Sequence, residues 1–251
     1  MSSQKFTQYL LEKYAADFQK ATNHPFLEQS GNGSIDIKPL RSWLKQDYLY
    51  AYVGYPKFAS ALLSKLHFPT PLFSHPTPNL SKAFSVLSFS LANAKRETQF
   101  FVDTAKQHGL DVFSQEANDG AEDGGKGLLG EYNEVTRAYV DFLQATGALG
   151  SVEEGFVVIW TMEIAYLTAW QYAKTYHKEL AAADPASLTQ TQQALVKFVD
   201  NWTCDEFVEF VEGCAEIVDG AGIEIGSPLA ERCEEVFKRC IWLEQRFWPQ
   251  L

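Results

Sequence analysis

Apolar residues recur at intervals of three and four along almost the whole of this 251-residue chain. That spacing collects them on one face of a helix, whereas a half-buried strand needs strict alternation, and alternating runs between turn residues are scarce. With 46% hydrophobic and 14% aromatic residues, the chain has ample material for a core. The pattern therefore predicts an all-α protein of about seven or eight helices. Without a repeat or a linker, we expect a single domain over residues 1–251.

Local signals predict where these helices begin and end. The first is expected over residues 4–22, because a residue that precedes a proline, as in Asn23-His24-Pro25, avoids the α region. A glycine-rich turn is expected over residues 30–34, and a glycine- and acid-rich loop over 114–126. The other helices are expected over residues 37–65, 79–108 and 129–146, after capping boxes at Ser151–Glu154 and Thr203–Glu206, and from Ser227-Pro228 to Trp248.

The charge of the chain excludes some partners. Lys and Arg number 21 against 32 Asp and Glu, for a net charge of -11, and this field repels phosphate backbones and anionic lipid. Neither a signal peptide nor an apolar run of about 20 residues is evident. We expect no nucleic-acid or membrane partner, a cytoplasmic location, and free thiols at the four cysteines.

Several acids lie on apolar helix faces. Residues three and four positions away share the face of a helical side chain, and for Glu244 these are Cys240, Ile241, Phe247 and Trp248. Other acids in comparable surroundings are Asp47, Glu163 and, less strongly, Glu97.

An ionised carboxylate among apolar groups needs a partner or a raised pKa. For each acid alone, a place beside the core, from which it reaches solvent or bonds a buried tyrosine hydroxyl, is an equally good interpretation. Together the four favour a shared cavity in which carboxylates act as acid or base.

The sequence gives less support for a metal site or for a catalytic serine than for carboxylate catalysis. Di-iron sites in helical bundles use Glu-x-x-His pairs, and the sequence has none; it also lacks the G-x-S-x-G elbow. We expect neither a metal nor another cofactor.

Aromatic residues cluster between positions 43 and 55. A core is the commoner place for residues such as Trp43, Tyr48, Tyr50, Tyr52 and Tyr55, and they also suit stacking on a flat ligand. Tyrosines beside buried acids fit a planar, nitrogen-bearing heterocycle.

Several segments together resemble the TenA family of thiamin-salvage aminopyrimidine hydrolases. The strongest are His24-Pro25-Phe26, the run Trp43-Leu44-x-Gln46-Asp47-Tyr48-x-Tyr50, and Glu244-x-x-Phe247-Trp248 near the end of the chain. Further support comes from Glu97-x-x-Phe100-Phe101, Tyr139 and Asn201-Trp202-x-x-x-Glu206-Phe207. The resemblance spans nearly the whole chain and implies a helical bundle like that of haem oxygenase. Haem binding is not expected, because residues 4–22 contain no histidine.

The resemblance also implies roles for individual residues. Asp47 would hold the pyrimidine ring, Tyr50 would support the site, and Glu244 would transfer protons. Rings at Tyr139 and Trp202 would sandwich the substrate. The other residues expected to bind substrate are Tyr166, Glu97, Trp43 and Phe207.

One departure from the family concerns its nucleophilic cysteine. The larger branch carries that thiol in the helix occupied here by residues 160–166, which contain no cysteine. The chain is similar to the other branch, often called E-type, in which a glutamate, here Glu163, serves instead. Catalysis by Glu163, Glu244 and Asp47 is then expected to convert aminomethyl-pyrimidine, or its N-formyl derivative, towards hydroxymethyl-pyrimidine.

Two alternatives stay open on the sequence alone. One is a non-catalytic member of the fold that binds a small heterocycle or a protein partner. The other, weaker one is a metal oxygenase with carboxylate ligands. As an enzyme of this family, the protein is expected to form a homodimer or homotetramer.

Overall fold

The computed structural model describes residues 4–68, 77–110, 112 and 131–251. Within these ranges every regular element is helical, as the periodicity predicts. In chain order the elements are α1 (Phe6–Lys13), α2 (Ala15–Thr22), α3 (Pro25–Asn32), α4 (Ile37–Leu49), η1 (Tyr50–Gly54), α5 (Tyr55–Lys65), α6 (Pro78–Gln107), α8 (Glu134–Leu149), α9 (Val152–Thr175), α10 (Lys178–Ala182), η2 (Pro185–Ser187), α11 (Gln190–Asn201), α12 (Asp205–Asp219) and α13 (Pro228–Phe247).

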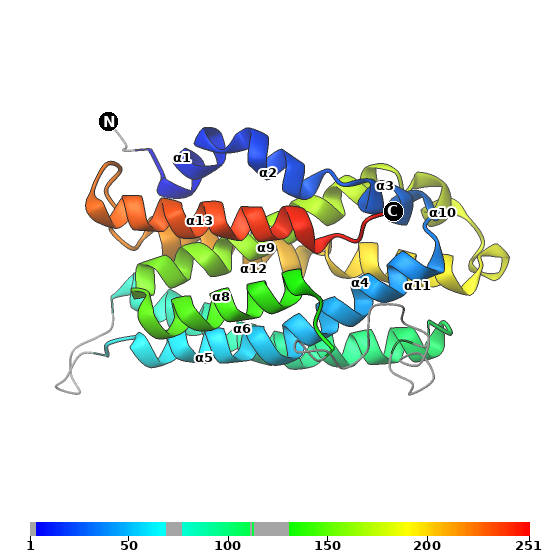
Figure 1. The fold of residues 1–251 in the computed structure, drawn as a ribbon, viewed down its shortest axis with the longest axis horizontal. Coiled ribbons are helices and arrows are strands. Elements are labelled where there is room, and N and C mark those ends of the chain that lie inside the picture. The colour runs from blue at the N-terminus through cyan, green and yellow to red at the C-terminus, as the bar shows by residue number, and fades with distance from the viewer. Residues whose placement is uncertain (1–3, 69–76, 111, 113–130) are drawn as a thin grey trace.

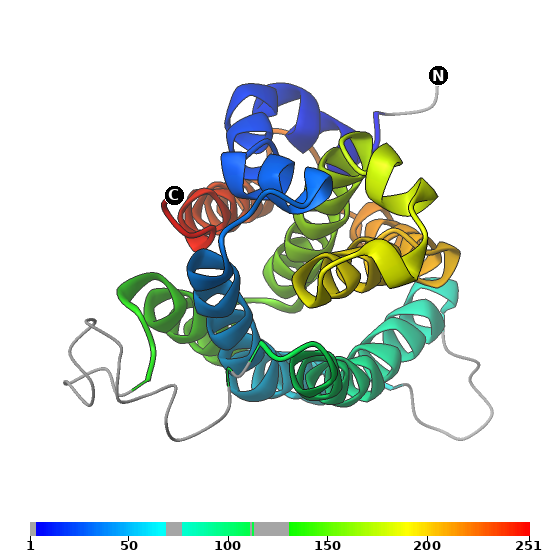
Figure 2. The same cartoon turned by 90° about the vertical axis from the view of Figure 1, so that its right-hand side faces the viewer.

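Helix α9 forms the centre of the bundle. It packs against α13, α12, α3 and α2, and the long helices run lengthwise around it (Figures 1 and 2). A helix that is apolar on every side is expected to be buried, and residues 155–163 of α9 are all buried. Glu163 is the one charged residue in that stretch, so the fold places it in the interior.

The first expected helix is broken in two. It ends at Thr22 as predicted, but Tyr14 leaves the helical conformation, with φ -113° and ψ 24°. The hydroxyl of Tyr14 donates a 2.5 Å hydrogen bond to Glu234 on α13, which also accepts from Tyr9 and Lys13. After the break α2 packs against α13, whereas α1 packs against α12, so the prediction of one continuous helix was wrong.

The glycine-rich turn expected over residues 30–34 is largely helix α3. His24 caps this helix, its Nδ1 accepting from the amide of Phe26 at 3.1 Å, and Gly33 ends it with φ 77°. Gly31 lies inside α3, where a Cβ would come within 2.1 Å of the carbonyl oxygen of Ala173 on α9. Gly31 therefore allows α3 and α9 to pack closely. The residues next to Gly31 in the sequence give no sign of this contact.

The helix expected over residues 37–65 is continuous but not uniform. Between α4 and α5 the five residues of η1 form a π-helix. Such wide turns change the direction in which the following side chains point from the helix, and they are frequent at functional sites. Here the π-helix supplies Tyr50 and Ala51 to the pocket described below.

The remaining boundaries follow the predictions with two exceptions. Helix α6 matches 79–108, α9 begins at the Ser151–Glu154 capping box, and α13 begins after Ser227. The helix expected over 129–146 starts later, at Glu134, because Asn133 caps it. The loop expected at 114–126 lies outside the described residues.

The capping box expected at Thr203–Glu206 was wrong. Helix α12 begins after Cys204, which makes no side-chain cap. Thr203 instead donates to the carbonyl of Val199 at 2.8 Å, and Glu206 pairs with Arg96.

The four cysteines are free thiols, as predicted, with Cys204 exposed and Cys214, Cys233 and Cys240 buried. No helix in the described part of the chain has the length and apolar character to cross a membrane.

Candidate active site

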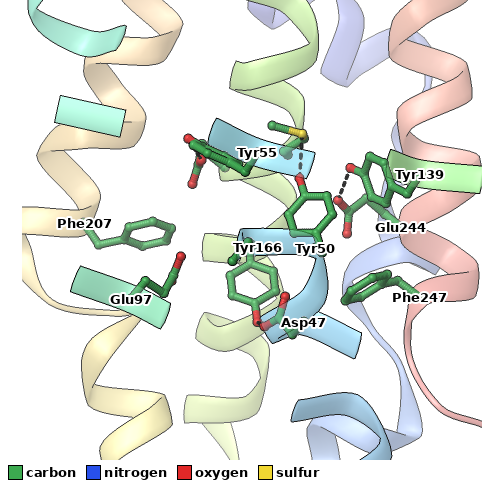
Figure 3. Close-up of a pocket in the computed structure, with 12 residues that line it drawn as sticks. Asp47, Tyr50, Tyr55, Glu97, Tyr139, Tyr166, Phe207, Glu244 and Phe247 are labelled. Carbon is green, nitrogen blue, oxygen red and sulfur yellow. Dashed lines mark hydrogen bonds between the residues drawn. The ribbon is translucent and has the colours of Figure 1, made fainter. Parts of the chain in front are cut away.

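Four acids from four different helices line one pocket. Asp47 comes from α4, Glu97 from α6, Glu163 from α9 and Glu244 from α13. The space between these side chains is about 500 Å³ when the open solvent at its mouth is included. Its other lining residues are Tyr50, Ala51, Tyr55, Tyr139, Met162, Tyr166, Phe207 and Phe247. Figure 3 shows tyrosines, phenylalanines and acids converging on it.

Each of three acids accepts a hydrogen bond from a tyrosine on another element. Tyr139 of α8 donates to Glu244 at 2.5 Å, and Tyr55 of α5 donates to Glu163 at 2.5 Å. Tyr166 of α9 donates to Asp47. Hydrogen bonds to ionised acceptors are short, and each fixes one carboxylate oxygen while leaving the other for a ligand.

The fourth acid, Glu97, stands between two cavities. It accepts a 2.6 Å hydrogen bond from the indole nitrogen of Trp202. Glu97 and Phe207 line both the carboxylate pocket and a second, outer cavity, which also includes Arg96 and Trp202. Glu97 is half-buried, while the other three acids are buried. It is therefore the acid of the pocket that lies nearest to the surface.

The pocket raises the pKa of every one of its acids. Burial is the main cause in each case, and it brings the pKa of Glu163 to about 8 and that of Glu244 to about 7. The pKa of Asp47 is raised well above its usual range by burial and by the charges of Glu97 and Glu244, against the hydrogen bond from Tyr166. Burial also raises the pKa of Glu97. Near neutral pH the cluster therefore holds protons that ordinary carboxyl groups would have lost.

No lysine, arginine or histidine is among the described residues that line the carboxylate pocket. Among the described residues, the side chains that donate hydrogen bonds to these acids are tyrosines and, at Glu97, Trp202. The arrangement thus favours a ligand that brings hydrogen-bond donors or positive charge. In the described part of the chain, no three His, Cys, Asp or Glu side chains are grouped to hold a metal ion.

The π-helix places Tyr50 in the middle of the pocket (Figure 3). Its hydroxyl donates to the sulfur of Met162 at 2.8 Å, and its ring contacts those of Tyr139 and Phe247 at centroid distances of 5.0 and 5.8 Å. Met162 and Glu163 are adjacent on α9 and both line the pocket. Helix α9 thus presents a thioether and a carboxylate to the pocket.

Most of the residues expected at the site are brought together. Besides Asp47, Glu163 and Glu244, the structure places in the pocket Tyr50, Tyr139, Tyr166, Glu97 and Phe207.

The two expected tryptophans do not line this pocket. Trp43 is buried in an aromatic cluster, with centroids 5.3 Å from Phe198 and 5.5 Å from Trp170. Trp202 belongs to the same cluster, 4.8 Å from Trp170, and it faces the outer cavity. Trp202 is therefore connected to the pocket indirectly, through its hydrogen bond to Glu97.

Sequence reasoning did not assign Tyr55, Ala51, Met162 or Phe247 to the site. Tyr55 stood out only as one of a run of aromatics, and its bond to Glu163 spans 108 positions of the chain. Phe247 carries a clearer signal, since it lies three residues after Glu244 on the same helix face.

Fold and site together define an all-helical bundle of the haem-oxygenase type with an enclosed carboxylate pocket. Comparison with known proteins agrees with this class. A model of the TENA/THI-4/PQQC family matches residues 11–69, a range that includes Asp47, Tyr50 and Tyr55. A TenA homologue from Pyrococcus furiosus superposes with a TM-score of 0.73 at 21% identity, covering 97% of this chain and 98% of its own. A structure described as a putative TenA-like thiaminase, from Sulfolobus solfataricus, gives 0.63 at 17% identity, covering 96% and 93%. The resemblance to the TenA family is thus confirmed.

Two curated relatives match this chain over about half of their own length. A protein of Fusarium pseudograminearum (strain CS3096), named a probable transcription factor, is 25% identical over 279 residues, covering 97% of this chain and 51% of its own length. A Glycine max protein, named a probable bifunctional TENA-E protein, is 27% identical over 115 residues, covering 45% of this chain and 46% of its own. The chain therefore spans about half the length of these relatives.

Proposed function

We propose that the protein is a hydrolase of thiamin-salvage pyrimidines, acting on aminomethyl-pyrimidine or its N-formyl derivative by carboxylate acid and base catalysis. The observation that carries the proposal is the convergence of Asp47, Glu97, Glu163 and Glu244 on one aromatic pocket without a lining cation. The names of the Sulfolobus and Glycine max relatives agree with it. The glutamate at position 163 supports the E-type branch.

Ring recognition is assigned to Asp47. An aminopyrimidine offers an amino group beside a ring nitrogen, and a carboxyl group matches this edge with two hydrogen bonds. Tyr166 fixes one oxygen of Asp47 and thereby orients the group. The rings of Tyr50 and Phe247, 5.8 Å apart, belong to the aromatic surface against which the flat substrate packs.

Proton transfer is assigned to Glu244 and Glu163. The pKa of about 7 suits Glu244 to take a proton from the attacking water, and the pKa of about 8 lets Glu163 keep a proton for the leaving amine. Water adds to the methylene carbon as its bond to nitrogen breaks. The products are the hydroxymethyl-pyrimidine and ammonia, and the net consumption is one water.

An N-formyl substrate needs one preceding hydrolysis. Water attacks the formyl carbon, the C–N bond of the amide breaks, and formate leaves with the free aminomethyl-pyrimidine as the other product. The same pair of carboxyl groups provides the base and the acid for this step.

Incubation of the purified protein with each compound, followed by mass spectrometry, tests the proposal. We expect hydroxymethyl-pyrimidine to accumulate, and no turnover of either compound would refute the hydrolase assignment. Binding without turnover would instead support the non-catalytic alternative. Elemental analysis of the same sample tests the metal oxygenase, which requires stoichiometric iron or manganese.

Glu244→Gln and Glu163→Gln then test the roles of the two acids. Each should reduce the rate by orders of magnitude, since each removes a proton-transferring group. Glu209→Gln, at an exposed position of α12, is the matched control and should retain full activity. Unchanged rates in both site variants would refute the assignment of these acids.

A further inference from the structure

A buried thiol lies directly behind the proposed base. Cys240 precedes Glu244 by one turn of α13, so the two side chains share a face. Its sulfur is 3.0 Å from the hydroxyl oxygen of Tyr139, the same hydroxyl that donates to Glu244. Cys240 and Tyr139 are 0% and 1% exposed, so solvent does not compete for these contacts.

The positions of the hydrogens follow from counting donors. A tyrosine hydroxyl has one hydrogen and can accept from other donors. In this site that hydrogen goes to Oε1 of Glu244. When Glu244 is ionised and takes that hydrogen, the contact between Cys240 and Tyr139 uses the thiol hydrogen, with the tyrosine oxygen as acceptor. The three groups form a chain in which sulfur donates to the phenol and the phenol donates to the carboxylate.

We propose that Cys240 is a positioning residue that holds the Tyr139 hydroxyl towards Oε1 of Glu244. A hydrogen bond received by a hydroxyl strengthens the one that it donates. The chain therefore stabilises the ionised form of Glu244 and fixes its orientation. Tyr139 is the one hydrogen-bond partner that the described residues give Glu244, so Oε2 stays available to exchange a proton with whatever occupies the pocket.

Cys240 has no covalent part in this arrangement. Burial and the neighbouring charge of Glu244 raise the pKa of its thiol well above the usual range, so the sulfur keeps its hydrogen and is a poor nucleophile. The sulfur is also absent from the described lining of the pocket. It acts through Tyr139 alone.

The chain contains a matched control for this role. Cys233 lies on the same helix, two turns earlier, and is equally buried at 0% exposure. Within the described ranges no hydrogen bond joins it to the Tyr139–Glu244 pair. Truncating Cys233 removes a buried sulfur of the same kind without touching the proposed chain of hydrogen bonds.

The test is a titration of Glu244 by carbon NMR on protein labelled at the glutamate carboxyl carbon, with the signal assigned from Glu244→Gln. In Cys240→Ala the pKa of Glu244 should rise by roughly half a unit or more, because the ionised form loses stabilisation. Cys240→Ser keeps a donor and should restore the wild-type value, and Cys233→Ala should not change it. The proposal would be overturned if the pKa of Glu244 did not change in Cys240→Ala, or if it changed equally in Cys233→Ala. The readout needs no turnover, so it stands apart from the outcome for pyrimidine hydrolysis.

A second measurement covers the case in which Cys240→Ala does not fold. The infrared S–H stretching band of a thiol moves when the thiol donates a hydrogen bond. Tyr139→Phe removes the acceptor, so one band should move to the position of a free thiol. Tyr50→Phe is the control, because it removes a neighbouring hydroxyl that bonds to Met162 and not to Cys240. Its spectrum should keep the band of the hydrogen-bonded thiol. Identical S–H bands in wild type and Tyr139→Phe would refute the donation from Cys240.

Discussion

Tyr139 donates a 2.5 Å hydrogen bond to Glu244 from a different helix of the bundle. Tyr55 stands in the same relation to Glu163, also at 2.5 Å. In both cases this bond lowers the pKa of a carboxyl group that burial raises. A tyrosine hydroxyl thus acts in the same way on both acids, but the charges of Glu97, Glu244 and Asp47 raise the pKa of Glu163 further.

The first prediction concerns the pH dependence of hydrolysis. Activity requires Glu244 to have lost its proton and Glu163 to have kept its own. The rate constant kcat/KM should therefore rise through pH about 7 and fall through about 8, with a narrow maximum between. Because the two groups interact, the limbs belong to the pair. A rate that keeps rising well above pH 8 would contradict the role of Glu163 as the acid.

The two tyrosines should move opposite limbs of that profile. Tyr139→Phe removes the bond that lowers the pKa of Glu244 and should shift the acidic limb upward. Tyr55→Phe does the same for Glu163 and should shift the alkaline limb upward, which widens the active range. A hydrogen bond to a charged group contributes about 1.5–3 kcal/mol, so shifts of about one to two pKa units are expected. Profiles of the two variants with one substrate provide the measurement, and movement of both limbs in either variant would argue against separate roles.

Much of this site is predictable because helical spacing is local. Asp47, Glu163 and Glu244 each lie among apolar residues three and four positions away, and burial follows from that spacing. The pairing of acids with tyrosines is different. Tyr55 and Glu163 are 108 positions apart, and Tyr139 and Glu244 are 105 apart. Such contacts depend on tertiary packing, which spacing does not encode.

The errors in the predicted fold have a related cause. The glycines at 31 and 33 are typical of a turn, yet the helix there is stabilised by packing against α9. The π-helix at 50–54 keeps the same apolar pattern as an α-helix, so periodicity does not distinguish them. The Thr203–Glu206 motif fits a capping box, but Thr203 finds a backbone carbonyl and Glu206 finds Arg96. In each case a contact made in three dimensions overrides the local preference.

A third prediction follows from the raised pKa values. In the unfolded chain Glu163 and Glu244 ionise near 4.5, whereas in the folded protein they keep their protons up to about 8 and 7. Their contribution to stability is complete below pH 4.5 and is lost as the pH rises to about 8. The free energy of unfolding should fall over that range by on the order of a few kcal/mol. Urea unfolding at a series of pH values should show a shallower fall in Glu163→Gln and an unchanged one in Glu209→Gln.

A fourth prediction distinguishes Trp202 from Trp43, the two tryptophans that the resemblance to the TenA family assigns to substrate binding. Trp202 holds Glu97 through its indole nitrogen, whereas the indole nitrogen of Trp43 has no hydrogen-bond partner among the described residues. Trp202→Phe should reduce kcat/KM by about tenfold or more, the value of a hydrogen bond to a charged group. Trp43→Phe should change it by no more than about twofold, because a ring of the same kind remains in the cluster. Equal losses in both variants would show that Trp43 acts on the site as well.

The last prediction concerns the close approach of α3 to α9. A Cβ on Gly31 would lie 2.1 Å from the carbonyl oxygen of Ala173, a backbone atom that cannot move without shifting α9. Gly31→Ala should therefore destabilise the protein by about 1–3 kcal/mol despite the better helix propensity of alanine.

Gly213→Ala is the matched control. Gly213 also lies inside a regular helix, and the atom nearest to its new Cβ is 3.3 Å away. There the nearest atom belongs to the side chain of Val86, which has to give by only a few tenths of an ångström, so Gly213→Ala should cost less stability than Gly31→Ala. Urea unfolding of both variants measures the difference, and equal stability would mean that α3 is free to move away from α9. Because α9 carries Met162, Glu163 and Tyr166 into the pocket, the destabilised variant should also lose activity, and Gly213→Ala should not.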